Sequence, residues 1–139
     1  MAAISITPAN VVKSSAGASS SGIAGATITA GQTLYIDTAN NNVLKPAVAN
    51  GTAISSAVVG IAEHGALTGQ PVRYCTSDTA FGLGATLAIG DTVWAHSTAG
   101  AMTITASDIV TGFYNTFIGV AVSTTAIKLN LTSAGAAKV

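Results

Sequence analysis

The sequence has 139 residues, the size of one domain and enough to bury a hydrophobic core without disulfides or metal ions. Charged residues make up only 7% of it, against about 25% in a typical soluble domain, and five basic residues balance five acidic ones. A neutral chain with scattered basic residues lacks the electrostatic footprint of a nucleic-acid-binding protein and the polybasic patch of a membrane-surface protein, so we expect neither partner.

The sequence also lacks the signals of export and of membrane insertion. No stretch approaches the roughly 18 apolar residues of a membrane-spanning helix. The first residues have neither the basic region nor the apolar run of a signal peptide. Cys75 is the only cysteine, so an intrachain disulfide is impossible and we expect a small buried hydrophobe. Synthesis and assembly in the cytoplasm fit these features.

Residues 1–24 differ in composition from the rest and are predicted to form an N-terminal arm and linker. Ile4 to Val12 is rich in β-branched residues and reads as extended, and Pro8 disfavours a helical conformation of the residue before it. Residues 13–22 are mostly small or polar, which is typical of a flexible linker. This pattern favours an arm that orders on a partner. The alternative is an N-terminal strand of the same sheet followed by a long loop.

The β domain is expected to occupy residues 25–139. In its first half, apolar and polar residues alternate up to Asp37, and an asparagine-rich turn follows, since Asn tolerates positive φ. A short return strand ends at Pro46. A longer apolar run ends at Ala62, with Gly60 marking a bulge or a close backbone approach. We expect strands over 33–37, 43–45, 52–62 and 72–76.

The second half repeats this plan with a turn over 97–100. Ser107 and Asp108 are candidates to cap one helical turn that ends near Gly112. The Ala/Gly-rich tail over 132–139 is expected to fray. We expect strands over 91–96, 102–104, 113–122 and 127–131.

The repetition is an internal duplication. Residues 25–35 read GATITAGQTLY and residues 84–94 read GATLAIGDTVW, at an offset of 59. The same offset holds without a gap as far as Ala62 and Ala121. The period is longer, and the copies are fewer, than in solenoid arrays. We therefore predict two pseudo-symmetric halves, 25–62 and 84–121, with Tyr35 and Trp94 at equivalent buried positions.

The predicted fold is all-β. Short strands, turn signals and β-branched residues recur throughout, and no segment shows sustained helical periodicity. These features favour a single-domain antiparallel β-sandwich or small barrel of jelly-roll type, with the extended N-terminal arm added to it.

No arrangement of residues indicates chemistry. The two histidines, His64 and His96, lack cysteine or carboxylate partners at metal-ligand spacing. The carboxylates form no close pair of the kind that glycoside hydrolysis needs, and no G-x-S-x-G nucleophile motif is present. The sequence therefore predicts no catalytic residue, no metal and no cofactor, and we expect a protein that is not an enzyme.

Several motifs resemble those of the capsid decoration (cement) proteins of tailed bacteriophages. They are the extended start over 4–12, the segment over 24–35, the GIA and TGQPV pieces over 60–62 and 68–72, and the TAG and DIVTGFY pieces over 98–100 and 108–114. The resemblance covers residues 4–131. It implies a β-sandwich or jelly-roll protein that binds the outer surface of a phage head and reinforces contacts between major capsid proteins.

This resemblance implies partners and a location. They are the major capsid protein, further copies of the chain in a dimer or trimer, and the outer capsid surface after assembly in the host cytoplasm. The chain's sparse charge agrees with a protein packed against neighbours. The candidates for capsid contact all lie in the arm: Ile4, Ile6, Val11, Val12 and Lys13.

The alternative function is a glycan-binding or adhesin-type module on a virion or cell surface. Such a module needs exposed aromatic rings over a groove. This chain has one Trp, three Tyr and three Phe, so the sequence gives that function little support.

Overall fold

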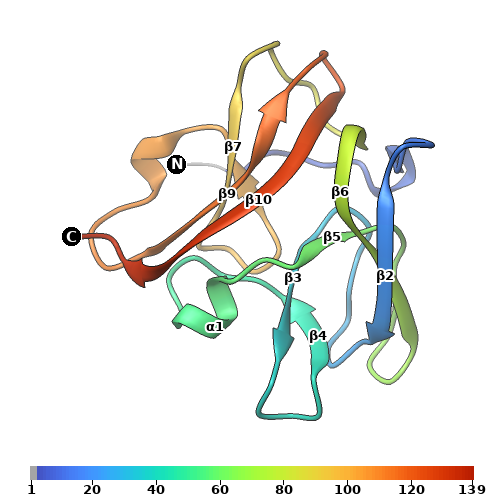
Figure 1. Ribbon diagram of the computed structural model, residues 1–139, viewed down its shortest axis with the longest axis vertical. Coiled ribbons are helices and arrows are strands. Elements are labelled where there is room, and N and C mark those ends of the chain that lie inside the picture. Colours follow the sequence, from blue (N-terminus) through green and yellow to red (C-terminus); the bar gives the residue numbers. More distant parts are fainter. Residues whose placement is uncertain (1–2) are drawn as a thin grey trace.

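The computed structural model describes residues 3–139 and is all-β, with a single antiparallel sheet curled into a half-barrel (Figure 1). Its strands are β1 (Val11–Val12), β2 (Ala18–Ile23), β3 (Thr33–Asp37), β4 (Val43–Pro46), β5 (Gly60–Ala62), β6 (Pro71–Leu83), β7 (Thr92–Ala95), β8 (Met102–Thr103), β9 (Tyr114–Ala121) and β10 (Ala126–Ala137). The short helices are η1 (Pro8–Asn10), α1 (Ala53–Ser56) and η2 (Ala106–Asp108). The expected all-β class is confirmed. The strands belong to one sheet and not to two stacked sheets.

The sheet is organised on β6, a strand of thirteen residues. The main strand order is β4-β3-β5-β6-β10-β9-β7-β8, and β1 and β2 also pair with β6. Tyr74 lies between β2 and β5, Ser77 between β2 and β10, and Gly82 between β1 and β10. Strands β1 and β2 therefore share one edge of β6, and β5 and β10 share the other.

The segments 25–62 and 84–121 make the same hydrogen bonds at several places. The Gly31 N–H donates to the Ala62 oxygen, and 59 positions later the Gly90 N–H donates to the Ala121 oxygen, both at 2.9 Å. The cross-strand neighbours correspond as well: Leu34 faces Gly60, and Val93 faces Gly119. The correspondence does not extend to the strands that follow these two segments, β6 and β10. Strand β6 carries β1 and β2 on its second edge, whereas β10 lies between β6 and β9.

Gly60, at the start of β5, and Gly119, within β9, mark close backbone approaches, one of the two roles that the sequence predicts for Gly60. A Cβ at Gly60 would lie 2.5 Å from the Cys75 oxygen, and a Cβ at Gly119 would collide with the Lys128 oxygen. Only glycine permits strands to pass so near each other without displacing the backbone.

The hydrophobic core has two parts. The main core lies between β5, β6, β7, β8, β9 and β10, and its largest fully buried side chains are those of Ile61, Phe81, Leu83, Val93, Met102, Ile118 and Ile127. A second core packs where β3, β4 and β6 meet the chain before β3, around Ile28, Leu34, Leu44 and Val72. Cys75 is fully buried in the main core, as predicted.

Three segments differ from the sequence prediction. Residues 18–23 form strand β2 where a flexible linker was expected. Small polar residues bury little surface, yet antiparallel pairing with β6 satisfies those of their backbone groups that face β6. The tail is not frayed, because β10 continues to Ala137 and pairs with β9. Strand β6 likewise continues to Leu83, past its expected end.

The strand predicted over 52–62 is wrong in its first part. Residues 53–56 form helix α1, because the Thr52 side chain accepts from the Ser55 N–H and the Ser55 side chain accepts from the Thr52 N–H. This reciprocal capping box starts a helix that hydrophobic patterning alone does not indicate.

Tyr35 and Trp94 occupy corresponding strand positions, but both are half-buried and not buried as predicted. In β7 the neighbours Val93 and Ala95 face the core, so strand alternation turns Trp94 to the opposite face. There its ring packs edge-on against Phe117, with centroids 5.3 Å apart, and its indole N–H donates to the Thr92 hydroxyl at 3.2 Å.

Candidate functional site

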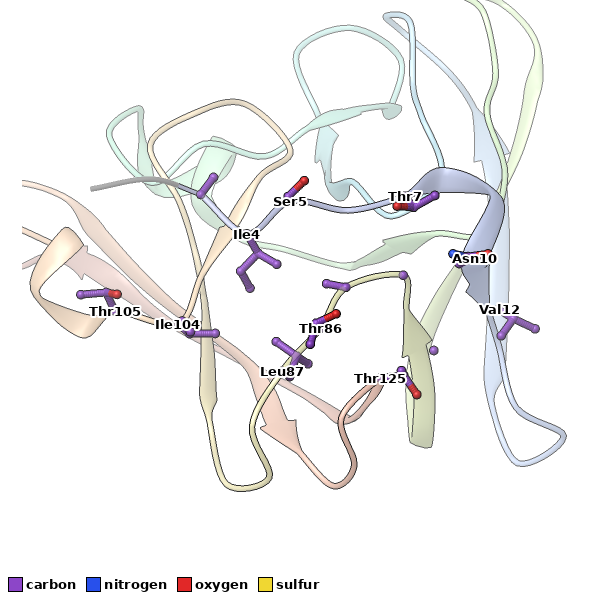
Figure 2. A pocket seen from close by; sticks show the side chains of 14 residues that line it. Ile4, Ser5, Thr7, Asn10, Val12, Thr86, Leu87, Ile104, Thr105 and Thr125 are labelled. Carbon is purple, nitrogen blue, oxygen red and sulfur yellow. The ribbon is translucent and has the colours of Figure 1, made fainter.

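Residues 3–12, here called the N-terminal strap, cross from β8 to the end of β6 (Figure 2). The Ile4 N–H donates to the Met102 oxygen, and the Thr7 N–H donates to the Gly84 oxygen, both at 2.8 Å. Beyond η1, β1 pairs with the last residues of β6. Pairing of main-chain groups thus fixes the strap at both of its ends.

The sequence of the strap explains its path. Pro8 lies in the first turn of η1, where its missing N–H costs nothing, and it holds Thr7 in an extended conformation, as predicted. Gly84 has φ of +75°, and a Cβ there would lie 2.6 Å from the Thr7 oxygen. Only glycine at position 84 allows the strap to lie this close to the sheet.

The structure separates the predicted capsid-contact residues into two groups. Ile4, Ile6 and Val11 are half-buried against the main core of their own chain. Val12 is 64% exposed on the other face of β1. Lys13 is half-buried, and its ammonium group donates to the Gly17 oxygen at 3.3 Å. Of the five candidates, Val12 alone presents a large exposed apolar side chain.

Asp78 anchors the segment that follows the strap. Its carboxylate is 4% exposed and accepts from the Ser14 N–H at 2.8 Å, from the Ser14 hydroxyl and from the Ala80 N–H at 3.0 Å. Burial opposes ionisation, but these hydrogen bonds outweigh burial and hold the pKa of the carboxyl below its ordinary value. Ser14 is therefore hydrogen-bonded to the ionised side chain of Asp78 in the middle of β6.

A groove of about 860 Å³ lies beside the strap. One wall is the strap, from Ala3 to Val12, and the other walls are formed by residues 82–87, by residues 104–105 and by Thr125. Figure 2 shows Ile4, Leu87 and Ile104 among its apolar side chains, next to Thr86 and Thr105. A smaller depression of about 240 Å³ is lined by other strap residues together with residues 29–32 and 99–101.

The groove carries no charge. None of its fourteen lining residues is ionisable; they are small, hydroxyl-bearing, amide or aliphatic. Exposed Val12 and Ile104, the latter 43% exposed, contribute its apolar surface. Such a surface binds through hydrogen bonds from hydroxyl, amide and backbone groups and through apolar contact.

Both histidines outside the groove form hydrogen bonds within the fold, and the cysteine is buried. His64 accepts from the Arg73 N–H at Nε2, so Nδ1 carries the proton and donates to the Gly65 oxygen. His96 is buried, and its Nδ1 accepts from the Thr98 N–H. Burial raises the pKa of the Cys75 thiol to about 11, which keeps it protonated and unreactive. Residues 3–139 contain no group of three or more potential metal ligands.

Sequence reasoning missed Ile104, Gly84 and Asp78 as parts of this region. Gly84 opens the second copy of the repeated frame, and its place beside the strap has no local signal. Asp78 sits 64 residues from Ser14. One sequence feature indicates a specific partner for Asp78: it is an acidic residue within a run of strand-forming residues.

No protein-family model, no curated protein and no solved structure matches this chain. Over residues 3–139, no helix has the length and apolar character needed to cross a membrane.

Proposed function

We propose that this protein is a structural component of a tailed-bacteriophage head, a cement protein that binds the outer surface and stabilises contacts between major capsid proteins. The observation that carries the proposal is the uncharged groove beside the strap, with Val12 and Ile104 exposed at it. A surface of this kind suits permanent contact with another folded protein, because apolar and hydroxyl groups bury without leaving charges unpaired.

The proposal includes a definite mode of attachment. Ile6 and Val11 pack against their own core, whereas Ile4 contacts that core and also lines the groove, so the capsid contact uses the groove-lining face of the strap and the groove wall across from it. The strap acts as part of a preformed surface, which lowers the entropy lost on binding. Partners under this proposal are the major capsid protein and further copies of the chain, and the protein joins the particle during assembly in the host cytoplasm.

The proposal also includes the evolutionary plan of the fold. We infer that the half-barrel derives from two pseudo-symmetric halves preceded by an N-terminal arm. The matching hydrogen bonds of Gly31 and Gly90, and the equal registers of Gly60 and Gly119, support a duplicated ancestor. In this plan β1 and β2 are additions that cover the second edge of β6.

Co-sedimentation with phage heads that lack the protein tests the attachment. Val12→Asp and Ile104→Asp place a charge at the groove and should each reduce occupancy at least tenfold. Leu67→Asp is the matched control, because Leu67 is 60% exposed and lies outside the groove. Each variant is first shown to retain the wild-type circular dichroism.

Two results would oppose the proposal. If the wild-type protein fails to sediment with heads but binds a glycan array, the adhesin-type function is correct. If the groove variants and Leu67→Asp lose binding equally, the contact lies elsewhere on the surface.

A further inference from the structure

We propose that the outer edge of β2 pairs antiparallel with β2 of a second copy of this chain, in a two-fold dimer centred on Ser20. The inference concerns the contact between copies only. Its test uses the free protein, so it stands or fails independently of attachment to a phage head.

The backbone groups of β2 point alternately toward β6 and away from it. Ala24 donates its N–H to the Gln70 oxygen, on the β6 side. Backbone groups alternate along a strand, so those of Ser20 and Gly22 also face β6, and those of Ser19 and Ser21 face outward. Gly25 agrees with this alternation, because its N–H points away from β6 and donates to the Leu44 oxygen.

The outward groups of Ser19 and Ser21 have no strand partner among residues 3–139. The only strand that pairs with β2 is β6, and the chain leaves the β2 line at Ala24, which bridges to Leu44 of β4. In Figure 1, β2 lies on the right-hand side of the molecule, and β6 with the loop before it passes behind β2.

This edge lacks the protection that the other edges have. Strand β4 carries Lys45, which is paired with Asp37 at 2.8 Å, and ends at Pro46. Strand β8 has two residues, and the Met102 oxygen already accepts from the Ile4 N–H. Strand β2 contains no charged residue and no proline, and its one irregularity precedes Ser19. Proteins protect free edges against strand pairing, so an unprotected polar edge indicates a partner.

The hydrogen-bonding pattern fits a second copy of β2. When Ser20 faces Ser20 of the second copy across a two-fold axis, Ser19 faces Ser21 of that copy, and Ser21 faces its Ser19. All outward N–H and C=O groups of the two residues are then paired, in four hydrogen bonds. A two-fold contact requires such a self-complementary surface.

The charges beside the strand are complementary in the same register. Arg73 lies across from Ser21 on β6, and Glu63 accepts a hydrogen bond from the Ser19 hydroxyl. Pairing Ser21 with Ser19 of the second copy leaves two strand spacings, about 10 Å, between the backbones of Arg73 and of that Ser19. Glu63 follows β5 on the other edge of β6, and its side chain extends across β6 to the Ser19 hydroxyl, toward the arginine of the second copy. The two-fold axis makes this contact twice.

Sedimentation equilibrium of the free protein is the first test. The wild-type chain should show a monomer–dimer equilibrium in the submillimolar range. Ser21→Pro removes the outward N–H and should weaken the dimer at least tenfold, whereas Ser21→Ala keeps that N–H and should dimerise like the wild type. Circular dichroism checks that Ser21→Pro is folded. Arg73→Glu should also weaken the dimer, and adding Glu63→Lys to it should restore dimerisation. This charge-reversal comparison is a test that does not depend on the proline variant.

Cross-linking tests the register. In the central pair the two Ser20 Cα atoms lie about 4.5 Å apart, within the range that a disulfide spans. Under mild oxidation Ser20→Cys should form a covalent dimer at least tenfold faster than Ser15→Cys, an exposed control just outside the strand. A wild-type chain that stays monomeric at every concentration, or equal cross-linking rates for the two variants, would overturn the inference.

Discussion

Asp78 shows how one side chain connects the start of the chain to the sheet. Its carboxylate accepts hydrogen bonds from both the backbone and the hydroxyl of Ser14 while it is almost fully buried. An ionised acceptor makes these bonds stronger than neutral ones. The residue therefore has a structural role that depends on its charge.

Asp78→Asn should lower the free energy of unfolding at pH 7 by about 1.5–3 kcal/mol, the usual contribution of a hydrogen bond to a charged group. The folded-state pKa of Asp78 is lowered, so its contribution is complete above the unfolded value near pH 4 and is lost as the pH falls through the lower folded value. Urea denaturation from pH 7 to pH 3 measures the difference between wild type and variant, which should shrink only below about pH 4.

Asp91→Asn is the matched control for that measurement. Asp91 accepts from the Ala88 N–H at 2.9 Å in an exposed turn, so its replacement should cost less than about 1 kcal/mol. Equal losses of unfolding free energy in the two variants would show that the buried contacts with Ser14 add nothing to stability beyond those of an exposed turn.

Gly84 and Gly90 separate backbone strain from contact with the strap. Both have positive φ, +75° and +92°, but only a Cβ at Gly84 meets the strap. Gly90→Ala should cost about 1–2 kcal/mol for the left-handed conformation alone. Gly84→Ala should cost about 1 kcal/mol more, because the Thr7 hydrogen bond is also displaced. Thermal unfolding measures both variants, and a smaller loss at position 84 than at position 90 would contradict the close approach of the strap.

Among the elements of the fold, the strap is held to the sheet less firmly than strand β6 is. Two hydrogen bonds outside β1 connect it to the sheet, and its apolar side chains are half-buried. Strand β6, in contrast, pairs on both edges and contributes fully buried residues to the main core. Local stability follows this difference in pairing and burial.

Hydrogen exchange in the free protein should therefore show an order of protection. The amides of Ile4 and Thr7 should exchange much faster than those of Tyr74 and Phe81 in β6, through local detachment of the strap. Exchange measured by NMR on the full chain gives the rates residue by residue. Strap amides as protected as those of β6 would mean that the strap opens only when the whole domain unfolds.

Much of the sheet is predictable from local patterns. Alternation, turn asparagines and the repeated frame indicate β3, β4, β7, β8 and β9 within a residue or two. Asn41 and Asn42 adopt the positive φ expected of the turn. Hydrophobic patterning fails to predict β2, because this segment is a strand only through main-chain pairing with β6, and its serines are typical of a linker. It also fails at α1, where a capping box overrides the apolar run before Gly60.

The groove was not predictable, because it joins parts of the chain that are distant in sequence. Ile4, Leu87 and Ile104 share one surface only after the sheet has curled. The sequence predicts that the apolar residues of the arm contact the capsid, and in the structure three of them, Ile4, Ile6 and Val11, pack against the core of their own chain. Periodicity identifies an apolar residue but does not identify the surface that covers it.

At the scale of the whole molecule, sparse charge has a measurable consequence. The chain has no net charge, and the groove has no ionisable residue. Attachment to phage heads should therefore change less than about twofold between low and moderate salt, because screening acts only on charged contacts. Occupancy on heads after equilibration at several salt concentrations measures this. Wholesale release at moderate salt would indicate an electrostatic contact.

We propose that the protein binds the outside of a phage head through the groove and the groove-lining face of the strap. Electron cryomicroscopy of heads with and without the purified protein tests it most directly. The account predicts additional density on the outer surface only, into which the half-barrel fits with Val12 and Ile104 turned toward the shell. Heads without additional density, or density with the groove turned away from the shell, would contradict it.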